Sequence, residues 1–200
     1  TLSESGEGIL WCVRRTIEDL KIVVPENFRL ESFIGPPLAD SFYRLGLDDE
    51  KVKLGVKTYK SYYDTKGKYM NKAYDGIKEL LERLREKGYK LGVATSKYEL
   101  FARQIIDNIG LLQYFDFVSG ATANAERQKK IDVLNYGIKN LGATPENSAL
   151  IGDTKFDAEG ARLCGCGFVG VLYGYGTRKE MEAEGAVNFA ETAGKIEKFL

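Results

Sequence analysis

The sequence contains no histidine at all, and this absence removes several kinds of active site. A serine–histidine or cysteine–histidine nucleophile pair, a histidine-ligated zinc ion and an imidazole general base all require that residue. Acid–base chemistry in this protein must therefore come from carboxylates, lysine or tyrosine.

Cysteine is scarce as well, and its three copies are Cys12, Cys164 and Cys166. An odd number, with two cysteines only two positions apart, argues against a disulfide framework. A Cys-x-Cys metal or redox site is the alternative, but small reduced thiols are typical of a protein that resides in the cytoplasm. We therefore expect free thiols and a cytoplasmic location.

Net charge and long apolar runs are also missing. Lysine plus arginine and aspartate plus glutamate number 29 each, so the charge balance does not favour nucleic acid or an anionic membrane as a partner. No apolar run reaches the roughly 20 residues that a membrane-spanning helix needs. The sequence also opens without a signal-peptide pattern. We expect neither a nucleic acid nor a membrane partner.

From about residue 74 onward, segments with helical spacing of apolar residues alternate with short apolar runs. Glycine follows several of the helical segments, as is typical of a helix end. The predicted strands are 89–94, 115–119, 149–151, 168–172 and 186–189, and a terminal helix is expected to contain Ile196 and Phe199. Such alternation predicts an α/β fold, with a doubly wound (Rossmann-like) parallel sheet between two layers of helices.

The first 75 residues have a different pattern, dominated by helices. One helix is expected over 10–20 and another over 52–63, the second capped by Asp48. The paired prolines in 33–38 predict an extended turn, and 22–24 is the single candidate strand. The sequence thus predicts an all-helical insert within an α/β core, with these bounds: insert 9–73, core 1–8 and 74–200.

Three predicted strands of the core end in polar residues, and ligands of an open α/β sheet bind at the carboxyl ends of its strands. Thr95 and Ser96 follow the first of these strands, where a hydroxyl beside free backbone N–H groups can hold a phosphate oxygen. A plain helix N-cap is the alternative for this pair.

The second polar strand end is Gln128-Lys129-Lys130, just before a predicted helix. Lys130 would supply a positive point charge for a phosphoryl group. A solvated lysine pair is the alternative, but a cation at a helix N-terminus opposes the helix dipole. A bound anion or a carboxylate nearby would offset that cost.

The third polar strand end is the Gly152-Asp153-x-x-x-Asp157 motif. Two carboxylates so close together are unfavourable unless a cation or hydrogen-bond donors compensate. Magnesium favours such a setting, since it binds one or two carboxylates together with water and phosphate oxygens. An N-cap role for Asp153 is the alternative.

Taken together, the order and placement of these motifs resemble the haloacid dehalogenase superfamily of phosphohydrolases. Thr95 corresponds to the second motif of that superfamily, Lys130 to the third, and Asp153 with Asp157 to the fourth. The stretches FIGPPL, YDGI, VATSK and GVLYGYG make the sequence most similar to the branch of phosphoglycolate phosphatases and bacterial 5′-nucleotidases.

This resemblance implies a magnesium-dependent phosphomonoester hydrolase that acts through an aspartyl-phosphate on a small phosphorylated metabolite, either phosphoglycolate or a nucleoside 5′-monophosphate. It implies that Thr95, Ser96 and Lys130 bind phosphate, and that Asp153 ligates Mg²⁺ while Asp157 steadies the metal shell or Lys130. The helical insert would be a cap domain, and the protein a monomer or a homodimer.

One motif of the superfamily is not in the sequence. Its Asp-x-Asp-Gly-Thr motif provides the nucleophile and the acid–base aspartate, and the chain opens with Thr1-Leu2-Ser3, which resembles the end of that motif. Both aspartates and their strand are therefore expected before Thr1. A β-phosphoglucomutase-like phosphomutase shares the other motifs and is an alternative, as is an inactive binding remnant if the first motif is truly deleted. A signalling receiver domain is far shorter and has no helical insert.

Overall fold

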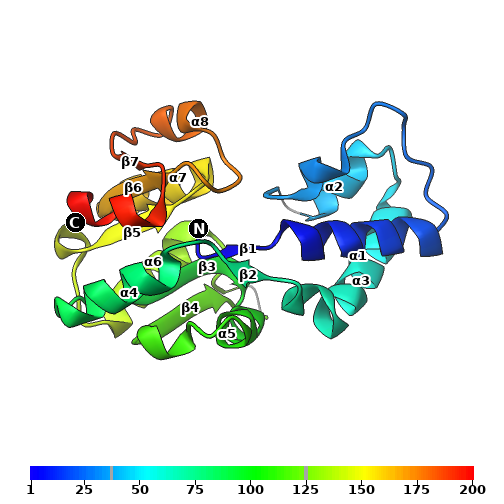
Figure 1. Ribbon diagram of the computed structural model, residues 1–200. Coiled ribbons are helices and arrows are strands. Elements are labelled where there is room, and N and C mark those ends of the chain that lie inside the picture. The colour runs from blue at the N-terminus through cyan, green and yellow to red at the C-terminus, as the bar shows by residue number, and fades with distance from the viewer. Residues whose placement is uncertain (37, 124–125) are drawn as a thin grey trace. The chain divides into compact units, whose positions relative to one another are not determined.

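A computed structural model describes residues 1–36, 38–123 and 126–200, and the chain forms two compact units (Figure 1). The first unit comprises Thr1–Ser3 and Ala73–Leu200, and the second comprises Glu4–Lys72. The sequence predicted a boundary at residue 8, but that position lies inside the helix α1, Gly6–Asp19. A helix that buries one continuous face against its neighbours belongs entirely to one unit.

Helices build the second unit. Its elements are α1 (Gly6–Asp19), α2 (Leu38–Arg44), α3 (Asp49–Thr65) and the 3₁₀ turns η1 (Leu30–Phe33) and η2 (Gly67–Tyr69). Asp48 caps α3 as predicted, because its side chain accepts a hydrogen bond from the Lys51 N–H at 2.9 Å. None of the described helices combines the length and the apolar character needed to cross a membrane.

Two segments of this unit, 22–24 and 33–38, were predicted to have an extended backbone. The strand expected over 22–24 is wrong: this segment is irregular, and Val23 is 86% exposed, so no neighbouring strand satisfies its backbone. The predicted turn over 33–38 includes Pro37, which lies outside the described residues. Ile34 within it has an extended backbone, as a proline-rich segment favours.

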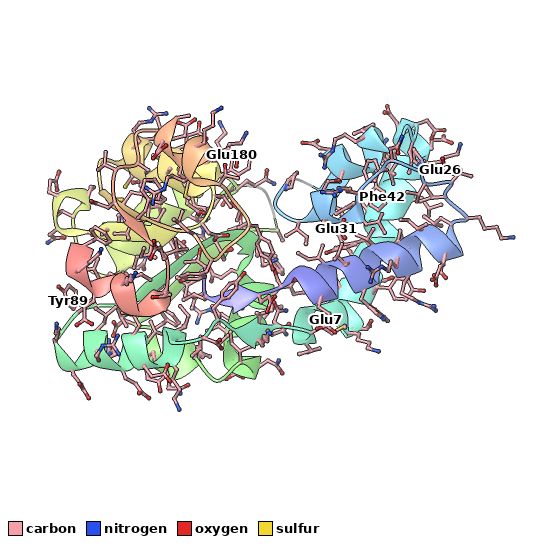
Figure 2. All side chains as sticks on the ribbon, turned by 45° about the horizontal axis from the view of Figure 1, so that its top comes forward. Glu7, Glu26, Glu31, Phe42, Tyr89 and Glu180 are labelled. Atoms are coloured by element: carbon pink, nitrogen blue, oxygen red, sulfur yellow. The ribbon has the colours of Figure 1, made fainter. Side chains whose placement is uncertain are left out.

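Phe42 fills the centre of the helical unit (Figure 2). Its side chain is fully buried, and its ring meets that of Phe33 edge to face at 5.1 Å between centroids. Gly55 of α3 faces the ring so closely that a Cβ there would lie 3.2 Å from it. The small residue therefore lets α2 and α3 pack around this phenylalanine.

The first unit contains two parallel sheets. Strand β3 (Gly92–Tyr98) pairs with β4 (Phe117–Ala121), and β5 (Ala149–Gly152) pairs with β6 (Gly167–Val171), which pairs in turn with β7 (Phe189–Ala190). The helices of this unit are α4 (Ile77–Glu86), α5 (Glu99–Asn108), α6 (Lys130–Asn140), α7 (Lys155–Cys164) and α8 (Arg178–Glu182). Each pair of successive parallel strands is connected through a helix, as parallel pairing requires.

Helices cover both faces of these strands. One face of the strands contributes Val93, Val118 and Val169 to a core shared with α4 and α5. The opposite face contributes Ala94 and Leu150 to a core shared with α6 and α7. Adjacent residues of β3 thus enter opposite cores, because successive side chains of a strand alternate. The doubly wound α/β architecture predicted from the sequence is confirmed.

Several predicted element bounds are wrong. The strand expected over 89–94 begins only at Gly92, because the Tyr89 N–H still bonds the Leu84 carbonyl at the end of α4. The strand expected over 186–189 is instead Phe189–Ala190, because the Ala186 N–H completes the end of α8. The terminal helix consists of two 3₁₀ turns, Ala193–Lys195 and Glu197–Phe199.

The parallel strands of the first unit fall into separate sheets. Among the described residues, β3 pairs with β4 and β5 pairs with β6, and no ladder joins β3 to β5. The start of the chain forms β1 (Ser3–Glu4), which pairs with β2 (Lys72–Ala73). Each of β3 and β5 therefore has one edge without a strand partner in the described part of the chain.

Replacing Phe42 with alanine should lower the free energy of unfolding by about 3–5 kcal/mol, because a fully buried aromatic ring is lost and α2 and α3 close the cavity only in part. Chemical denaturation measures the loss. Leu54→Ala on α3 is the matched control, since that side chain is half exposed and should change stability by less than about 0.5 kcal/mol. Equal effects of the two substitutions would contradict this packing.

Candidate functional site

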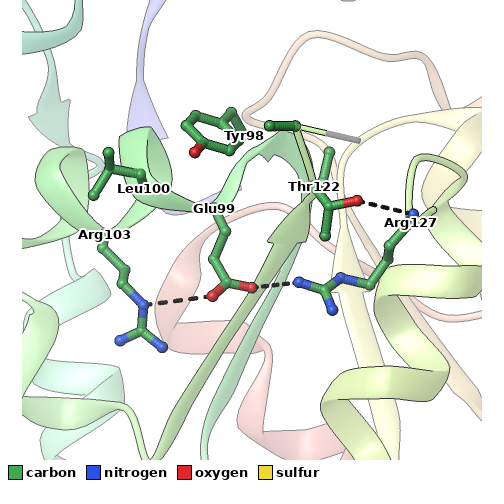
Figure 3. A pocket seen from close by; sticks show the side chains of 8 residues that line it. Tyr98, Glu99, Leu100, Arg103, Thr122 and Arg127 are labelled. Atoms are coloured by element: carbon green, nitrogen blue, oxygen red, sulfur yellow. Dashed lines mark hydrogen bonds and ion pairs between the residues drawn. The ribbon is translucent and has the colours of Figure 1, made fainter. Parts of the chain in front are cut away.

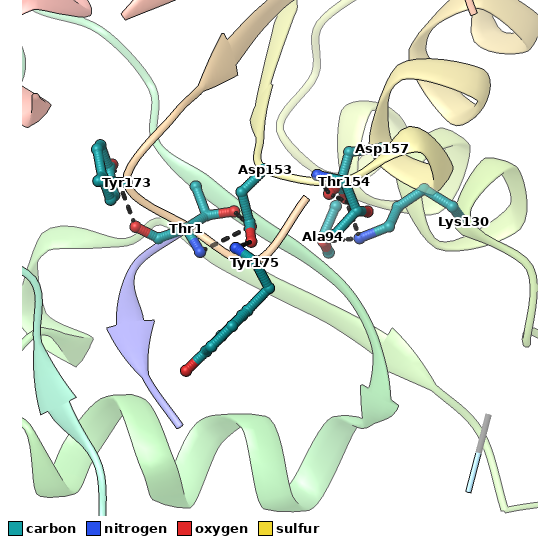
Figure 4. A network of polar contacts seen from close by, with 8 residues as sticks. All are labelled: Thr1, Ala94, Lys130, Asp153, Thr154, Asp157, Tyr173 and Tyr175. Carbon is teal, nitrogen blue, oxygen red and sulfur yellow. Dashed lines mark hydrogen bonds and ion pairs between the residues drawn. The ribbon is translucent and has the colours of Figure 1, made fainter. Parts of the chain in front are cut away.

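The carboxyl ends of β3, β5 and β6 carry the polar residues that the sequence singled out (Figure 4). All of them belong to the first unit. Parallel strands deliver their carboxyl ends to one edge of a sheet, and backbone N–H groups of the following helices open toward that edge. The geometry of this edge is built around two aspartates, Asp153 and Asp157.

Asp153 directly follows β5 and is 6% exposed. Its Oδ1 accepts hydrogen bonds from the Thr1 nitrogen at 2.8 Å and from the Thr1 hydroxyl. Its Oδ2 accepts a hydrogen bond from the Tyr175 backbone N–H at 2.9 Å. Burial raises the pKa of Asp153, while the hydrogen bonds from Thr1 and from the Tyr175 N–H lower it. Hydrogen-bond donors on both oxygens thus compensate the burial of this carboxylate.

The segment after β6 wraps around Asp153. A Cβ at Gly174 would lie 2.3 Å from the Asp153 carboxylate, so only glycine allows this approach. The Gly176 N–H donates to the Asp153 carbonyl at 3.0 Å, and the Tyr173 hydroxyl donates to the Thr1 carbonyl at 3.2 Å. Gly174 and Gly176 of the GVLYGYG stretch thus let the backbone of this segment lie directly against Asp153.

Asp157 makes a different set of contacts. Its Oδ1 lies 2.7 Å from Lys130 Nζ, while its Oδ2 accepts from the Thr154 N–H at 3.0 Å and from the Thr154 hydroxyl at 2.7 Å. Thr154 is the N-cap of α7, so the N-cap role considered for Asp153 is wrong. Asp157 instead completes the cap from the third helical position.

Lys130 begins α6 and is held on two sides. Besides the ion pair with Asp157, its ammonium donates to the Ala94 carbonyl of β3 at 3.1 Å, and its side chain is 15% exposed. The solvated lysine pair considered as an alternative is therefore wrong for Lys130. The carboxylate of Asp157 offsets the unfavourable position of this cation at a helix N-terminus.

Thr95 and Ser96 lie inside the extended end of β3 rather than at a helix cap. The N-cap of α5 is Tyr98, which makes no side-chain capping bond, so the N-cap alternative for these two residues is wrong. The Thr95 hydroxyl accepts a hydrogen bond from the Lys97 N–H at 3.2 Å, and Ser96 is exposed. Because the Ala94 carbonyl accepts a hydrogen bond from Lys130, the adjacent Thr95 lies close to that lysine.

The donor set at this edge suits a hard cation that keeps part of its water. In the part of the chain that the structure describes, no three carboxylate, cysteine or histidine side chains gather into a metal cluster. Asp153 is one buried carboxylate at the end of β5, and magnesium commonly binds through one or two carboxylates with water and phosphate. Both oxygens of Asp157 are engaged by Lys130 and Thr154.

Sequence reasoning missed four contributors to this edge: Thr1, Ala94, Thr154 and Tyr175. One of them carried a signal, because Thr154 precedes Asp157 by three residues, which is the spacing of a capping box. Ala94 and Tyr175 act through backbone atoms, which leave no mark of residue type, while Thr1 donates through both its nitrogen and its hydroxyl. Their roles follow only from the fold.

Comparison with known proteins places these features in a family. The family model of haloacid dehalogenase-like hydrolases matches residues 1–171. Tyrosine-protein kinase PtkA of Mycobacterium tuberculosis is 35% identical over 176 residues, which are 88% of this chain and 60% of PtkA. The chain thus spans about three fifths of that relative's length. A 5′-nucleotidase of Pseudomonas aeruginosa is 33% identical over 201 residues, which are 100% of this chain and 91% of that protein.

A solved structure of a related protein has the same fold as this chain. The crystal structure of a predicted phosphatase from Clostridium acetobutylicum superposes with a TM-score of 0.87 at 34% identity, over 99% of this chain and 92% of that one. Because the family model covers most of the chain and the relatives extend over nearly all of it, the chain belongs to the haloacid dehalogenase-like hydrolases.

Proposed function

We propose that the protein is a magnesium-dependent phosphatase that hydrolyses a small phosphorylated metabolite, phosphoglycolate or a nucleoside 5′-monophosphate. The observation that carries this proposal is that one unit brings a buried carboxylate, Asp153, and a lysine held by an ion pair, Lys130, to the carboxyl ends of its strands. Hydrolysis of a phosphate monoester needs a bound cation and a positive side chain, and Asp153 and Lys130 are the candidates to provide them.

In this proposal Lys130 binds an oxygen of the transferring phosphoryl group. Its ammonium has three donors, of which the Asp157 carboxylate and the Ala94 carbonyl use two. Among the described residues no other acceptor is bonded to this ammonium, so its third donor can bind substrate. Thr95 and Ser96 follow Ala94 directly, so their hydroxyls and N–H groups are the candidates to bind the remaining phosphate oxygens.

Asp153 is proposed as the carboxylate ligand of magnesium. Magnesium bound there supplies positive charge that screens the phosphate from an attacking carboxylate. Asp157 does not need to ligate the ion, because its two oxygens orient Lys130 and cap α7. The two aspartates of the motif would thus divide the work between cation binding and orientation of the lysine.

The attacking group is proposed to be an aspartate that precedes Thr1, giving an aspartyl-phosphate that water then hydrolyses. The Thr1 nitrogen lies 2.8 Å from Asp153 Oδ1, so residues joined to it would emerge beside the proposed cation ligand. In a longer chain that nitrogen is an uncharged peptide N–H. The residues before it would also adjoin the unpaired edges of β3 and β5.

Substrate and product distinguish a phosphatase from a phosphomutase and from a protein kinase. A phosphomutase would interconvert sugar phosphates without net release of phosphate, and a protein kinase, which is what the PtkA relative is named, would consume a nucleoside triphosphate. Incubating the native full-length protein with phosphoglycolate, nucleoside monophosphates and sugar phosphates, and measuring released inorganic phosphate, separates these activities. No phosphate release from any of them would reject the proposal.

Asp153→Asn should lower magnesium-dependent hydrolysis of p-nitrophenyl phosphate by at least roughly 10²-fold, because the buried anionic ligand is lost while the side-chain volume is kept. Circular dichroism verifies that the variant still folds. Asp107→Asn, on the exposed surface of α5, is the matched control and should leave the rate unchanged. Full activity of Asp153→Asn would be incompatible with a metal role for this residue.

Asp157→Ala should lower the free energy of unfolding by about 3 kcal/mol, because Lys130 loses its partner at a poorly exposed position and α7 loses its cap. Adding Lys130→Met to that variant should recover part of the loss, since the unpaired ammonium is removed and an apolar stem remains. Denaturation of both single variants and the double variant measures the coupling. Strictly additive losses would show that the ion pair contributes nothing.

A further inference from the structure

Arg127 stands three residues before Lys130, and its guanidinium joins three separate elements. Its Nε donates to the Gly120 carbonyl of β4 at 2.7 Å, and its Nη2 donates to the Glu99 carboxylate at 2.7 Å. Its guanidinium carbon also lies 3.8 Å from the ring centroid of Tyr136 in α6. One side chain therefore ties the end of β4, the start of α5 and the second turn of α6 together.

Glu99 completes the attachment from the other side. It is the first residue of α5, directly after β3, and its Oε2 accepts both from Arg127 and from the Gly120 N–H at 3.2 Å. A Cβ at Gly120 would lie 2.5 Å from the Glu99 Cα, so the two chain segments touch through backbone. The Arg127–Glu99 pair thus fixes the end of β4 against the end of β3.

Arg127 is also bonded to Thr122 through its own backbone. The Arg127 N–H donates to the Thr122 hydroxyl at 3.1 Å, and the Arg127 carbonyl accepts from the Thr122 N–H at 3.0 Å. Two hydrogen bonds therefore join Arg127 to Thr122, and the path to Lys130 starts from a fixed residue. Only two residues separate that residue from Lys130.

Arg127 is also well placed to hold a fixed geometry. Its side chain is 16% exposed, in the wall of a cavity of about 410 Å³ that Tyr98, Leu100 and Arg103 also line (Figure 3). The Arg127 guanidinium donates to one carbonyl and one carboxylate and lies over an aromatic ring. Because the guanidinium is planar and rigid, these contacts leave the side chain few alternative rotamers. A second contact supports α6 one turn later, where the Ser119 hydroxyl donates to the Val133 carbonyl at 2.6 Å.

We propose that Arg127 is a positioning residue for Lys130: by bridging Glu99, Gly120 and Tyr136 it sets the start of α6, so that the Lys130 ammonium reaches the Ala94 carbonyl and the candidate phosphate site. This inference rests on the proposed phosphatase function. Arg127 itself contacts neither Asp153 nor Asp157 in the described hydrogen bonds and ion pairs, so its effect on the reaction passes through the lysine.

The test compares Arg127→Ala with Arg103→Ala in the native full-length protein. Arg103 lines the same cavity and also approaches Glu99, at 3.8 Å, but it bonds neither Gly120 nor Tyr136, which makes it the matched control. Arg127→Ala should lower kcat/KM for p-nitrophenyl phosphate about tenfold to a hundredfold, as displacement of a reacting group by about 1 Å does. Arg103→Ala should change it less than twofold. Similar rates for the two variants would overturn the inference.

Two further measurements separate positioning from a general loss of stability. Methylguanidinium at millimolar concentration should restore part of the Arg127→Ala rate, with sodium chloride of equal strength as the control, because the vacated space accepts the lost group. Arg127→Lys should stay impaired, since an ammonium cannot reproduce the planar two-donor contact. No rescue by methylguanidinium, or a fully active Arg127→Lys, would contradict the proposal.

If Arg127→Ala does not fold, Glu99→Gln decides the question, since it keeps side-chain volume and the Gly120 contact while removing the charge opposite Arg127. It should lower kcat/KM several-fold, and an unchanged value would overturn the inference. An inactive wild-type protein would reject the proposed function and this inference with it. An active wild-type protein with an equally active Arg127→Ala rejects the inference alone.

Discussion

The ion pair between Lys130 and Asp157 is the contact on which the candidate site depends. It joins the first residue of α6 to the first turn of α7, and the same ammonium reaches back to the Ala94 carbonyl of β3. Because the pair is poorly exposed, removing either charge would leave the other buried without its partner. The pair therefore fixes where a positive charge stands at the carboxyl edge of the sheet.

The two aspartates of the Gly-Asp-x-x-x-Asp motif are chemically distinct because their surroundings differ. Asp157 gives both oxygens to protein donors, one of them charged, and these contacts orient Lys130 and cap α7. Asp153 faces the start of the chain and the glycine-rich segment after β6, which approaches it through backbone. A buried carboxylate of this second kind remains ionised only where a cation or several donors compensate its burial.

Local patterns of residue type predicted much of the fold. Helical spacing of apolar residues and the Asp48 cap were sufficient, because each is set by neighbours within one or two turns. Strand bounds were less well predicted. The ends of β3 and β7 depend on which backbone groups the adjacent helices α4 and α8 still use, and that competition is not written in the hydrophobic pattern.

The sequence by itself determined the alternation of strands and helices, and it placed Thr95, Lys130, Asp153 and Asp157 at strand ends or helix starts. Those positions follow from short-range periodicity and from the residue types that end a strand. Only the tertiary structure decided the pairing: which aspartate holds the lysine, which glycine admits the carboxylate, and how Arg127 links Glu99 to Gly120. These contacts join residues distant in sequence, many through backbone atoms common to every residue type, so no local pattern could specify them.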